Sequence, residues 1–192
     1  MLAILTSAGM ASAKTITILS DYTWKGSTTE QIGWNDTGFD DSGWGYVTSG
    51  TEPKRSWFLS TCLGNTSATG IWYNNCGNCE RYLRKIFNIN ESIISANLSI
   101  DVDDYYELYI NGQKVGNGTW GKAYCYDIRS YLQQGENVID VRVVNYGAND
   151  GLWLDSTIET KLTSLEIQLK MHKLCSILEQ TLDHTHQIVM DM

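Results

Sequence analysis

Proline, histidine and long apolar runs are scarce in this chain of 192 residues. There is one proline, and all three histidines lie after residue 160, so the preceding residues cannot build a Ser–His–Asp triad. No stretch approaches about 18 consecutive apolar residues, which excludes a transmembrane helix. Lys and Arg number 14 against 22 Asp and Glu, without a basic cluster, so nucleic acid is not expected as a partner.

Aromatic residues and glycine are abundant instead. The chain holds seven Trp, 11 Tyr and 17 Gly, all before residue 160, and its length corresponds to about one domain. This composition is typical of a folded, turn-rich globular domain and not of a disordered chain. We therefore expect one domain over residues 14–160 and a tail of different character over residues 161–192.

The two ends have patterns of their own. Residues 1–13 are small and apolar and end in Ala-Ser-Ala, which predicts a signal peptide truncated at its start, with an ordinary N-terminal strand as the alternative. In the tail, Leu and Ile recur at spacings near three and four, which predicts an amphipathic helix. This helix either docks on the domain or pairs with another chain, or the tail is an incidental product of a truncated or shifted reading frame.

Alternation of apolar and polar residues predicts strands within the domain. Ile94–Val102 alternates over nine residues, and Tyr106, Leu108 and Ile110 are expected to point inward before a turn at Asn111-Gly112. About nine short strands without intervening helices predict an all-β sandwich of two antiparallel sheets. The other expected strands are Lys14–Leu19, Trp57–Leu59, Ile71–Tyr73, Tyr82–Ile89, Ala123–Ile128, Val138–Val144 and Leu152–Ile158.

Four motifs together resemble a known family. Residues 34–44 read W-N-D-T-G-F-D-D-S-G-W, and Arg84–Phe87, residues 96–112 and residues 126–145 fit the same pattern in the same order. Over residues 15–158 the chain resembles the galactose-binding-like jelly-roll domains of bacterial β-galactosidases and α-L-rhamnosidases. The resemblance implies a jelly-roll β-sandwich that is a non-catalytic module of such enzymes. An insert over residues 48–80 departs from the pattern, and no catalytic barrel follows, so we expect a free-standing module or a fragment.

Residues of the motifs have structural interpretations. Phe39 and Trp44 are expected to pack in the core or at its rim, and Asp40-Asp41-Ser42 to cap a turn through side-chain hydrogen bonds. No catalytic residue and no enzyme activity are expected, because nothing singles out the two facing carboxylates of a glycosidase. No cofactor is expected, although a structural calcium ion could take oxygens from Asp101, Asp103 and Asp104. The alternation places Asp101 and Asp103 on the solvent face.

Cysteines and glycosylation sequons favour an extracellular or cell-surface location. Cys76 and Cys79 form a C-x-x-C motif. The motif lacks the βαβ setting of a redox site and the second C-x-x-C pair of a zinc site. Two disulfides are expected instead, with Cys62 joined to Cys76 or Cys79 as a staple of the insert, and Cys175 is left over. The disulfide candidates are Cys62, Cys76, Cys79 and Cys125, and the candidate glycosylation sites are Asn35, Asn65, Asn90, Asn97 and Asn117.

Three turn regions combine aromatic rings with amides and carboxylates, the groups that a sugar requires. The candidate ligand-binding residues are Trp72, Tyr73, Asn74, Trp120, Tyr146, Asn149, Asp150 and Trp153. The alternative is that Trp72 and Trp153 are core residues and Trp120 covers an apolar edge. We expect an extracellular, non-catalytic module that binds carbohydrate or glycoconjugates. The alternatives are a structural or adhesive building block that self-associates through residues 161–192, and an accessory domain of a larger glycoside hydrolase.

Overall fold

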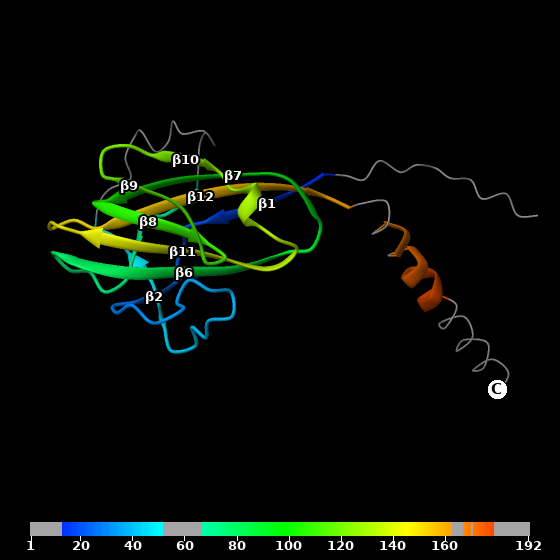
Figure 1. The fold of residues 1–192 in the computed structure, drawn as a ribbon, viewed down its shortest axis with the longest axis horizontal. Helices are drawn as coiled ribbons and strands as arrows, with labels where there is room; N and C mark the ends of the chain where they lie inside the picture. The colour runs from blue at the N-terminus through cyan, green and yellow to red at the C-terminus, as the bar shows by residue number, and fades with distance from the viewer. Residues whose placement is uncertain (1–12, 52–66, 163–166, 170, 179–192) are drawn as a thin grey trace, which may run out of the picture. The chain divides into compact units, whose positions relative to one another are not determined.

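The computed structural model describes residues 13–51, 67–162, 167–169 and 171–178. Thr15–Thr160 forms one compact unit, and the chain ends fall outside it. In the described part of this unit, the strands build two six-stranded sheets that face each other across an apolar core (Figure 1). The expected all-β sandwich of antiparallel sheets is confirmed.

The first sheet, sheet A, follows the order β10-β7-β12-β5-β4, with β1 also paired to β12. Its central strand β12 is buried without a break from Gly151 to Ser156, so both faces of the strand are covered. Leu152 and Leu154 enter the main core, whereas Trp153 packs on the other side against Ala68. The strands of sheet A are β1 (Lys14–Leu19), β4 (Thr48–Ser49), β5 (Ile71–Trp72), β7 (Ser92–Asp103), β10 (Tyr124–Asp127) and β12 (Gly151–Lys161).

The second sheet, sheet B, follows the order β3-β2-β6-β11-β8-β9. Ile139, Val141 and Val143 of β11 are fully buried in the core, so the residues between them point to the outer face. The antiparallel register places Asp140 of β11 opposite Arg84 of β6. The strands of sheet B are β2 (Lys25–Ser27), β3 (Gly45–Tyr46), β6 (Cys79–Ile89), β8 (Tyr105–Ile110), β9 (Gln113–Thr119) and β11 (Gly135–Asn145).

The predicted hairpin between β8 and β9 is confirmed. Tyr106, Leu108 and Ile110 are fully buried, and Asn111 and Gly112 have φ of 50° and 79°. The Asn111 amide donates to the Asn137 side-chain oxygen at 2.8 Å, and the Val138 N–H donates back to Asn111 at 2.9 Å. The hairpin is thereby joined to the start of β11.

One prediction from alternation is wrong. Asp101 and Asp103 are 0% and 7% exposed, although we expected them on the solvent face. Their strand β7 lies beside β12 inside sheet A and is buried continuously from Leu98 to Asp103. Alternation of apolar and polar residues distinguishes the two faces of a strand only where one face is exposed to solvent.

The tail is helical where the structure describes it. Residues 167–169 and 171–178 are α-helical, and Leu169, Leu174 and Leu178 are each about 60% exposed. Among the described residues, no helix is long and apolar enough to cross a membrane. The predicted strand Trp57–Leu59, Cys62, Asn65 and residues 1–12 of the predicted signal peptide lie outside the described residues.

Candidate functional site

Two exposed aromatic residues lie on loops anchored to the same residue, Asp104. Trp120 directly follows β9 and Tyr146 directly follows β11, with exposed fractions of 55% and 67%. The Trp120 N–H donates to the Asp104 carbonyl at 2.6 Å, and the Tyr146 N–H donates to the Asp104 carboxylate at 2.7 Å. Asp104 is itself fixed by its N–H, which donates to the Val144 carbonyl at 2.9 Å. We call Trp120, Tyr146 and their anchor Asp104 the aromatic rim.

A tyrosine cluster supports the loop that carries Trp120. Tyr106 meets Tyr124 edge to face at 5.8 Å, and its hydroxyl is 2.9 Å from that of Tyr126. Burial raises the pKa of the Tyr106 phenol, so this group stays protonated. A Cβ at Gly118 would lie 2.4 Å from the Tyr124 ring, so only glycine fits between these side chains. β9 and β10 are therefore packed tightly on both sides of Trp120.

Asp150 ties three loops together. Asp150 is only 1% exposed. Its Oδ1 accepts hydrogen bonds from the Thr51 N–H at 2.9 Å and from the Asn75 side-chain amide at 3.3 Å. The Asp150 N–H in turn donates to the Thr51 hydroxyl at 2.9 Å. Asp150 was predicted to contact a ligand, but its carboxylate is buried and holds the loops, so that assignment is corrected.

Two of the predicted aromatic platforms are buried. Trp72 is 0% exposed and belongs to the main core, and Trp153 is 1% exposed, with its ring 2.7 Å from where a Cβ on Gly70 would stand. The prediction that these rings meet a ligand is wrong, because β5 and β12 turn both of them into packed interiors. The alternative that they are core residues is correct.

The remaining candidates divide between packed and open positions. Tyr73 is half-buried, and its side chain fills the space above Gly26 and Gly45, where an added Cβ would meet it at 2.5 and 2.7 Å. Asn74 and Asn149 are exposed. The Arg81 guanidinium holds the turn by donating to the Asn74 carbonyl at 2.7 Å.

The cysteine pairing differs from the expected disulfide between Cys62 and Cys76 or Cys79. Cys76 and Cys79 are bonded to each other, with their Cα atoms 6.1 Å apart, so neither is joined to Cys62. Cys125 is also disulfide-bonded, and Cys175 is free and exposed. The Asn145 amide donates to the Cys76 carbonyl at 2.7 Å, which attaches the Cys76–Cys79 turn to the end of β11.

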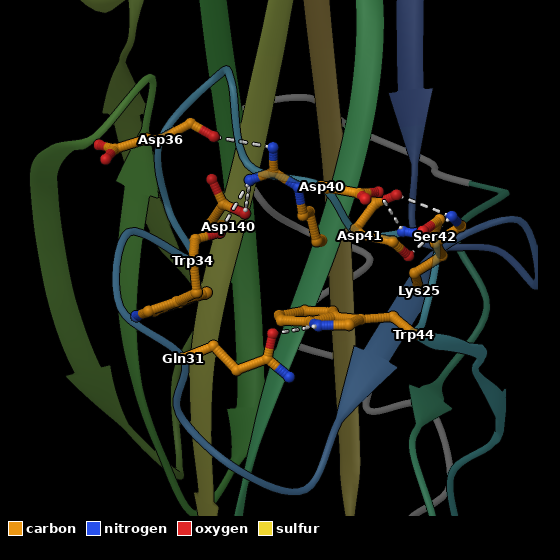
Figure 2. A network of polar contacts seen from close by, with 10 residues as sticks. Lys25, Gln31, Trp34, Asp36, Asp40, Asp41, Ser42, Trp44 and Asp140 are labelled. Carbon is orange, nitrogen blue, oxygen red and sulfur yellow. Dashed lines mark hydrogen bonds and ion pairs between the residues drawn. The ribbon is translucent and has the colours of Figure 1, made fainter.

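The motif of residues 34–44 lies against Arg84, a buried arginine on the outer face of sheet B. Figure 2 shows Trp34, Asp36, Asp41 and Asp140 of this network. Arg84 Nη1 donates to the Trp34 carbonyl at 2.9 Å and to Asp140 Oδ1 at 2.8 Å, and Nη2 donates to the Asp36 carbonyl at 2.8 Å. Arg84 Nε lies 3.3 Å from Asp41 Oδ2. One guanidinium thus fixes the segment between β2 and β3, residues 28–44, which we call the clamped loop.

The expected packing and capping roles within the clamped loop are confirmed. Phe39 and Trp44 meet edge to face at 5.5 Å. The Ser42 N–H donates to Asp40 Oδ1 at 2.9 Å, and this bond lowers the pKa of Asp40. Burial raises the pKa of Asp140 to about 8 against the opposing charge of Arg84. The pairing of Arg84 with Asp140 was not predicted from the sequence. The available signal was that each is a charged residue between apolar neighbours, at an outward position of its strand.

A hollow of about 350 Å³ opens between the clamped loop and β8. Trp34 meets Tyr82 and Tyr109 edge to face at 5.0 and 5.7 Å, which fixes the aromatic part of its wall. The residues that line the hollow are Glu30, Gln31, Ile32, Gly33, Trp34, Asn35 and Tyr109.

No group of three or more His, Cys, Asp or Glu side chains within the described ranges could hold a metal ion. Asp104, one of the carboxylates considered for calcium, accepts the Tyr146 N–H instead.

A family model described as the sugar binding domain of glycosyl hydrolases family 2 matches residues 70–177, more than half of the 192-residue chain. The chain belongs to this family. The resemblance read from the motifs is thereby confirmed. All three residues of the aromatic rim lie within the matched segment.

The relatives are much longer proteins. An alpha-L-rhamnosidase of Formosa agariphila is 25% identical over 114 residues, which cover 51% of this chain and 12% of the relative. A beta-galactosidase of Kluyveromyces lactis is 35% identical over 78 residues, 37% of this chain and 8% of the relative. The crystal structure of a glycosyl hydrolase family 2 member from Bacteroides cellulosilyticus is 21% identical with a TM-score of 0.52, over 74% of this chain and 20% of that one. That likeness shows the sandwich fold.

Proposed function

We propose that this sugar-binding domain binds carbohydrate non-covalently at the aromatic rim and catalyses no reaction. The observation that carries the proposal is the pair of exposed rings, Trp120 and Tyr146, on loops hydrogen-bonded to one residue. Sugars present a C–H face that packs on an aromatic ring, with hydroxyls around its edge that require polar partners. Membership of the family supports carbohydrate as the ligand class.

Exposed amides supply the polar partners. Asn149 follows Tyr146 in the same loop, and Asn74 lies in the turn attached by Arg81. Lys122, one residue beyond Gly121, stands 4.6 Å from the centroid of the Tyr124 ring. Stacking with a few hydrogen bonds gives a Kd on the order of mM to μM per site, so repeated sites would increase the apparent affinity.

The carboxylates near the rim support a binding role without catalysis. Asp104 accepts the Tyr146 N–H and Asp150 accepts from Thr51 and Asn75. A glycosidase needs two carboxyl groups that face the sugar from opposite sides. Asp104 and Asp150 instead use their oxygens to hold loops.

The proposal includes an extracellular setting. The Cys76–Cys79 disulfide favours an oxidising compartment, and three sequon asparagines, Asn90, Asn97 and Asn117, are exposed. Asn35 is half-buried in the clamped loop and is a poorer acceptor. The signal peptide over residues 1–13 and a structural calcium ion stay predictions.

A second candidate is an accessory role beside a glycoside hydrolase. It is supported by the matched relatives, of which the aligned segments form only 8% to 12%. The aromatic rim would then bring a sugar chain to a catalytic domain. A third candidate is assembly through the exposed apolar residues of the tail helix, such as Leu174 and Leu178, for which a concentration-dependent sedimentation coefficient is the test.

A glycan array with the full-length chain tests the principal proposal. We expect binding to a defined set of glycans and at least about a tenfold loss in Trp120→Ala, which removes the ring but keeps the backbone bond to Asp104. The matched control is Tyr46→Ala, because Tyr46 is 66% exposed on β3, in register with Lys25 and away from the rim. A folded wild-type chain that binds no glycan, or equal binding by Trp120→Ala, would contradict the proposal.

A further inference from the structure

The hollow beside Tyr109 is separate from the aromatic rim and is lined by different elements. Its volume of about 350 Å³ is at the lower end of the roughly 300–1,000 Å³ of small-molecule sites. It lies on the outer face of sheet B, where the clamped loop meets β8. The aromatic rim instead follows the ends of β9 and β11.

The walls of the hollow are held in place without a ligand. The Trp34 N–H donates to the Gln31 carbonyl at 3.0 Å, and the Asp36 N–H donates to the Gly33 carbonyl at 2.9 Å. Gly33 has a φ of 74°, which a residue with a side chain rarely adopts. The Trp34 carbonyl is fixed by the buried Arg84 guanidinium at 2.9 Å. A ligand would therefore enter a site whose backbone is already ordered.

The opposite wall is also fixed. The Tyr109 hydroxyl donates to Glu107 Oε2 at 3.2 Å, and its ring meets the edge of Trp34 at 5.7 Å. Glu107 is held in turn by Lys114 at 2.6 Å. Aromatic surface thus faces a loop that offers polar side chains.

The polar groups of the lining match the hydroxyls of a sugar. Gln31 Oε1 accepts the Trp44 indole N–H at 3.5 Å, which leaves the Gln31 amide N–H groups to donate (Figure 2). Asn35 carries an amide that can donate and accept, and Glu30 carries an exposed carboxylate that accepts. Ile32, which is fully exposed, adds an aliphatic edge. Amides, one carboxylate and aromatic walls are the combination that recognises a pyranose ring.

The charge of the lining selects among sugars. None of the seven lining residues is Lys or Arg, and Glu30 is acidic. The Lys114 ammonium, 5.9 Å from the centroid of the Tyr109 ring, is paired with Glu107. A uronate carboxylate would therefore meet like charge with no basic partner.

We propose that this hollow is a second carbohydrate site, which takes a neutral pyranose and rejects a uronic acid. The inference shares with the proposed function only the class of ligand. A chain with two such sites on different faces binds a polysaccharide at two points, which raises its apparent affinity.

Residue-resolved NMR on the full-length chain tests the second site. Methyl β-D-galactopyranoside, methyl α-L-rhamnopyranoside and methyl β-D-glucopyranosiduronate are titrated to about 50 mM, a range that covers weak sites. We expect the neutral glycosides to shift the amide signals of Gly33 and Trp34 and the side-chain amides of Gln31 and Asn35. The uronate should cause shifts at least about fivefold smaller at the same concentration.

Variants separate this site from the rim. Glu30→Ala/Gln31→Ala should remove the shifts, and Glu30→Ala alone, which changes only an exposed carboxylate, should weaken them. The matched control is Glu136→Ala/Gln113→Ala, which alters the same two residue types at exposed positions elsewhere.

Shifts only at Trp120 and Tyr146 would overturn the second site and leave the proposed function standing. Shifts only at Gly33 and Trp34 would do the reverse. The absence of shifts at both, a uronate that binds equally well, or shifts that survive the double substitution would also overturn the inference.

Discussion

The clamped loop and the loops of the aromatic rim are anchored in opposite ways. In the clamped loop, side chains do the anchoring: Arg84 joins Asp140 and Asp41 and binds two loop carbonyls, and Trp34 and Trp44 are 5% and 7% exposed. At the rim, backbone N–H groups do the anchoring through Asp104, and the rings of Trp120 and Tyr146 stay more than half exposed.

The comparison explains why similar residues have different roles in one sandwich. A tryptophan that seals a side-chain network contributes to stability through burial, which is worth about 25 cal/mol per Å² of apolar surface. Trp120, whose loop is held by its own N–H, is 55% exposed. Removal of the Trp34 or Trp44 ring should therefore reduce stability, and removal of the Trp120 ring should affect binding.

The largest effect is expected for Arg84→Met. The substitution leaves Asp140 and the carbonyls of Trp34 and Asp36 without their Arg84 donors, so the free energy of unfolding should fall by about 3–5 kcal/mol. Urea denaturation measures the change. The control is Arg142→Met on the same face of sheet B, because the Arg142–Glu80 pair is partly exposed and should cost less than about 1 kcal/mol. Equal losses of unfolding free energy in the two variants would contradict the anchoring role of Arg84.

A pH dependence should follow from Asp140. Its pKa is raised to about 8 by burial, so the folded chain keeps a proton that the unfolded chain loses above about pH 4. Unfolding then releases a proton, and stability falls as the pH rises through this window. The wild type should lose about 1–2 kcal/mol more than Asp140→Asn between pH 6 and pH 8, as measured by urea denaturation at both values. An equal pH dependence for the wild type and Asp140→Asn would show that Asp140 is already ionised beside Arg84 at pH 6.

Glycine substitutions compare the packing of the two regions directly. In Gly118→Ala the new Cβ would lie 2.4 Å from the Tyr124 ring, so we expect a loss of about 1–3 kcal/mol from overpacking. Gly38→Ala in the clamped loop meets no atom within 4 Å and should change stability by less than about 0.5 kcal/mol. Thermal unfolding of both variants is sufficient, and a larger loss for Gly38→Ala would refute the packing described around β9.

The smallest effect is expected for the double substitution Cys76→Ser/Cys79→Ser. The disulfide closes a very short loop, so the chain-entropy model gives about 1–2 kcal/mol. The Asn145 bond to the Cys76 carbonyl should also weaken, which moves the amide signal of Tyr146 in NMR spectra. Cys175→Ser, at an exposed free thiol, is the control and should leave both quantities unchanged. A Tyr146 signal that does not move would separate the disulfide from the rim.

The sequence predicts the sandwich well because short-range patterns specify most of it. Ile139, Val141 and Val143 follow period two and are buried, and Asn111-Gly112 forms the expected turn. The placement of Trp120 among glycines indicated a loop, and the residue follows β9 in a turn.

Long-range pairing accounts for the features that the sequence did not predict. Arg84 and Asp140 lie 56 positions apart and meet only through the register of β6 and β11. The cysteine pairing depends on Cα separations that spacing alone does not give. The burial of Trp72, and of Asp101 on β7, depends on which strands become neighbours and which faces are covered.

The position of Asp104 has a consequence for substitutions at the rim. Asp104 lies outside both rim loops, between β7 and β8, yet its carbonyl and carboxylate receive the N–H groups of residues 120 and 146. Those bonds require only a backbone N–H, so they do not depend on which side chain residues 120 and 146 carry. Under the proposed function, substitutions at positions 120 and 146 would therefore change the groups offered to a sugar while both backbone bonds to Asp104 are kept.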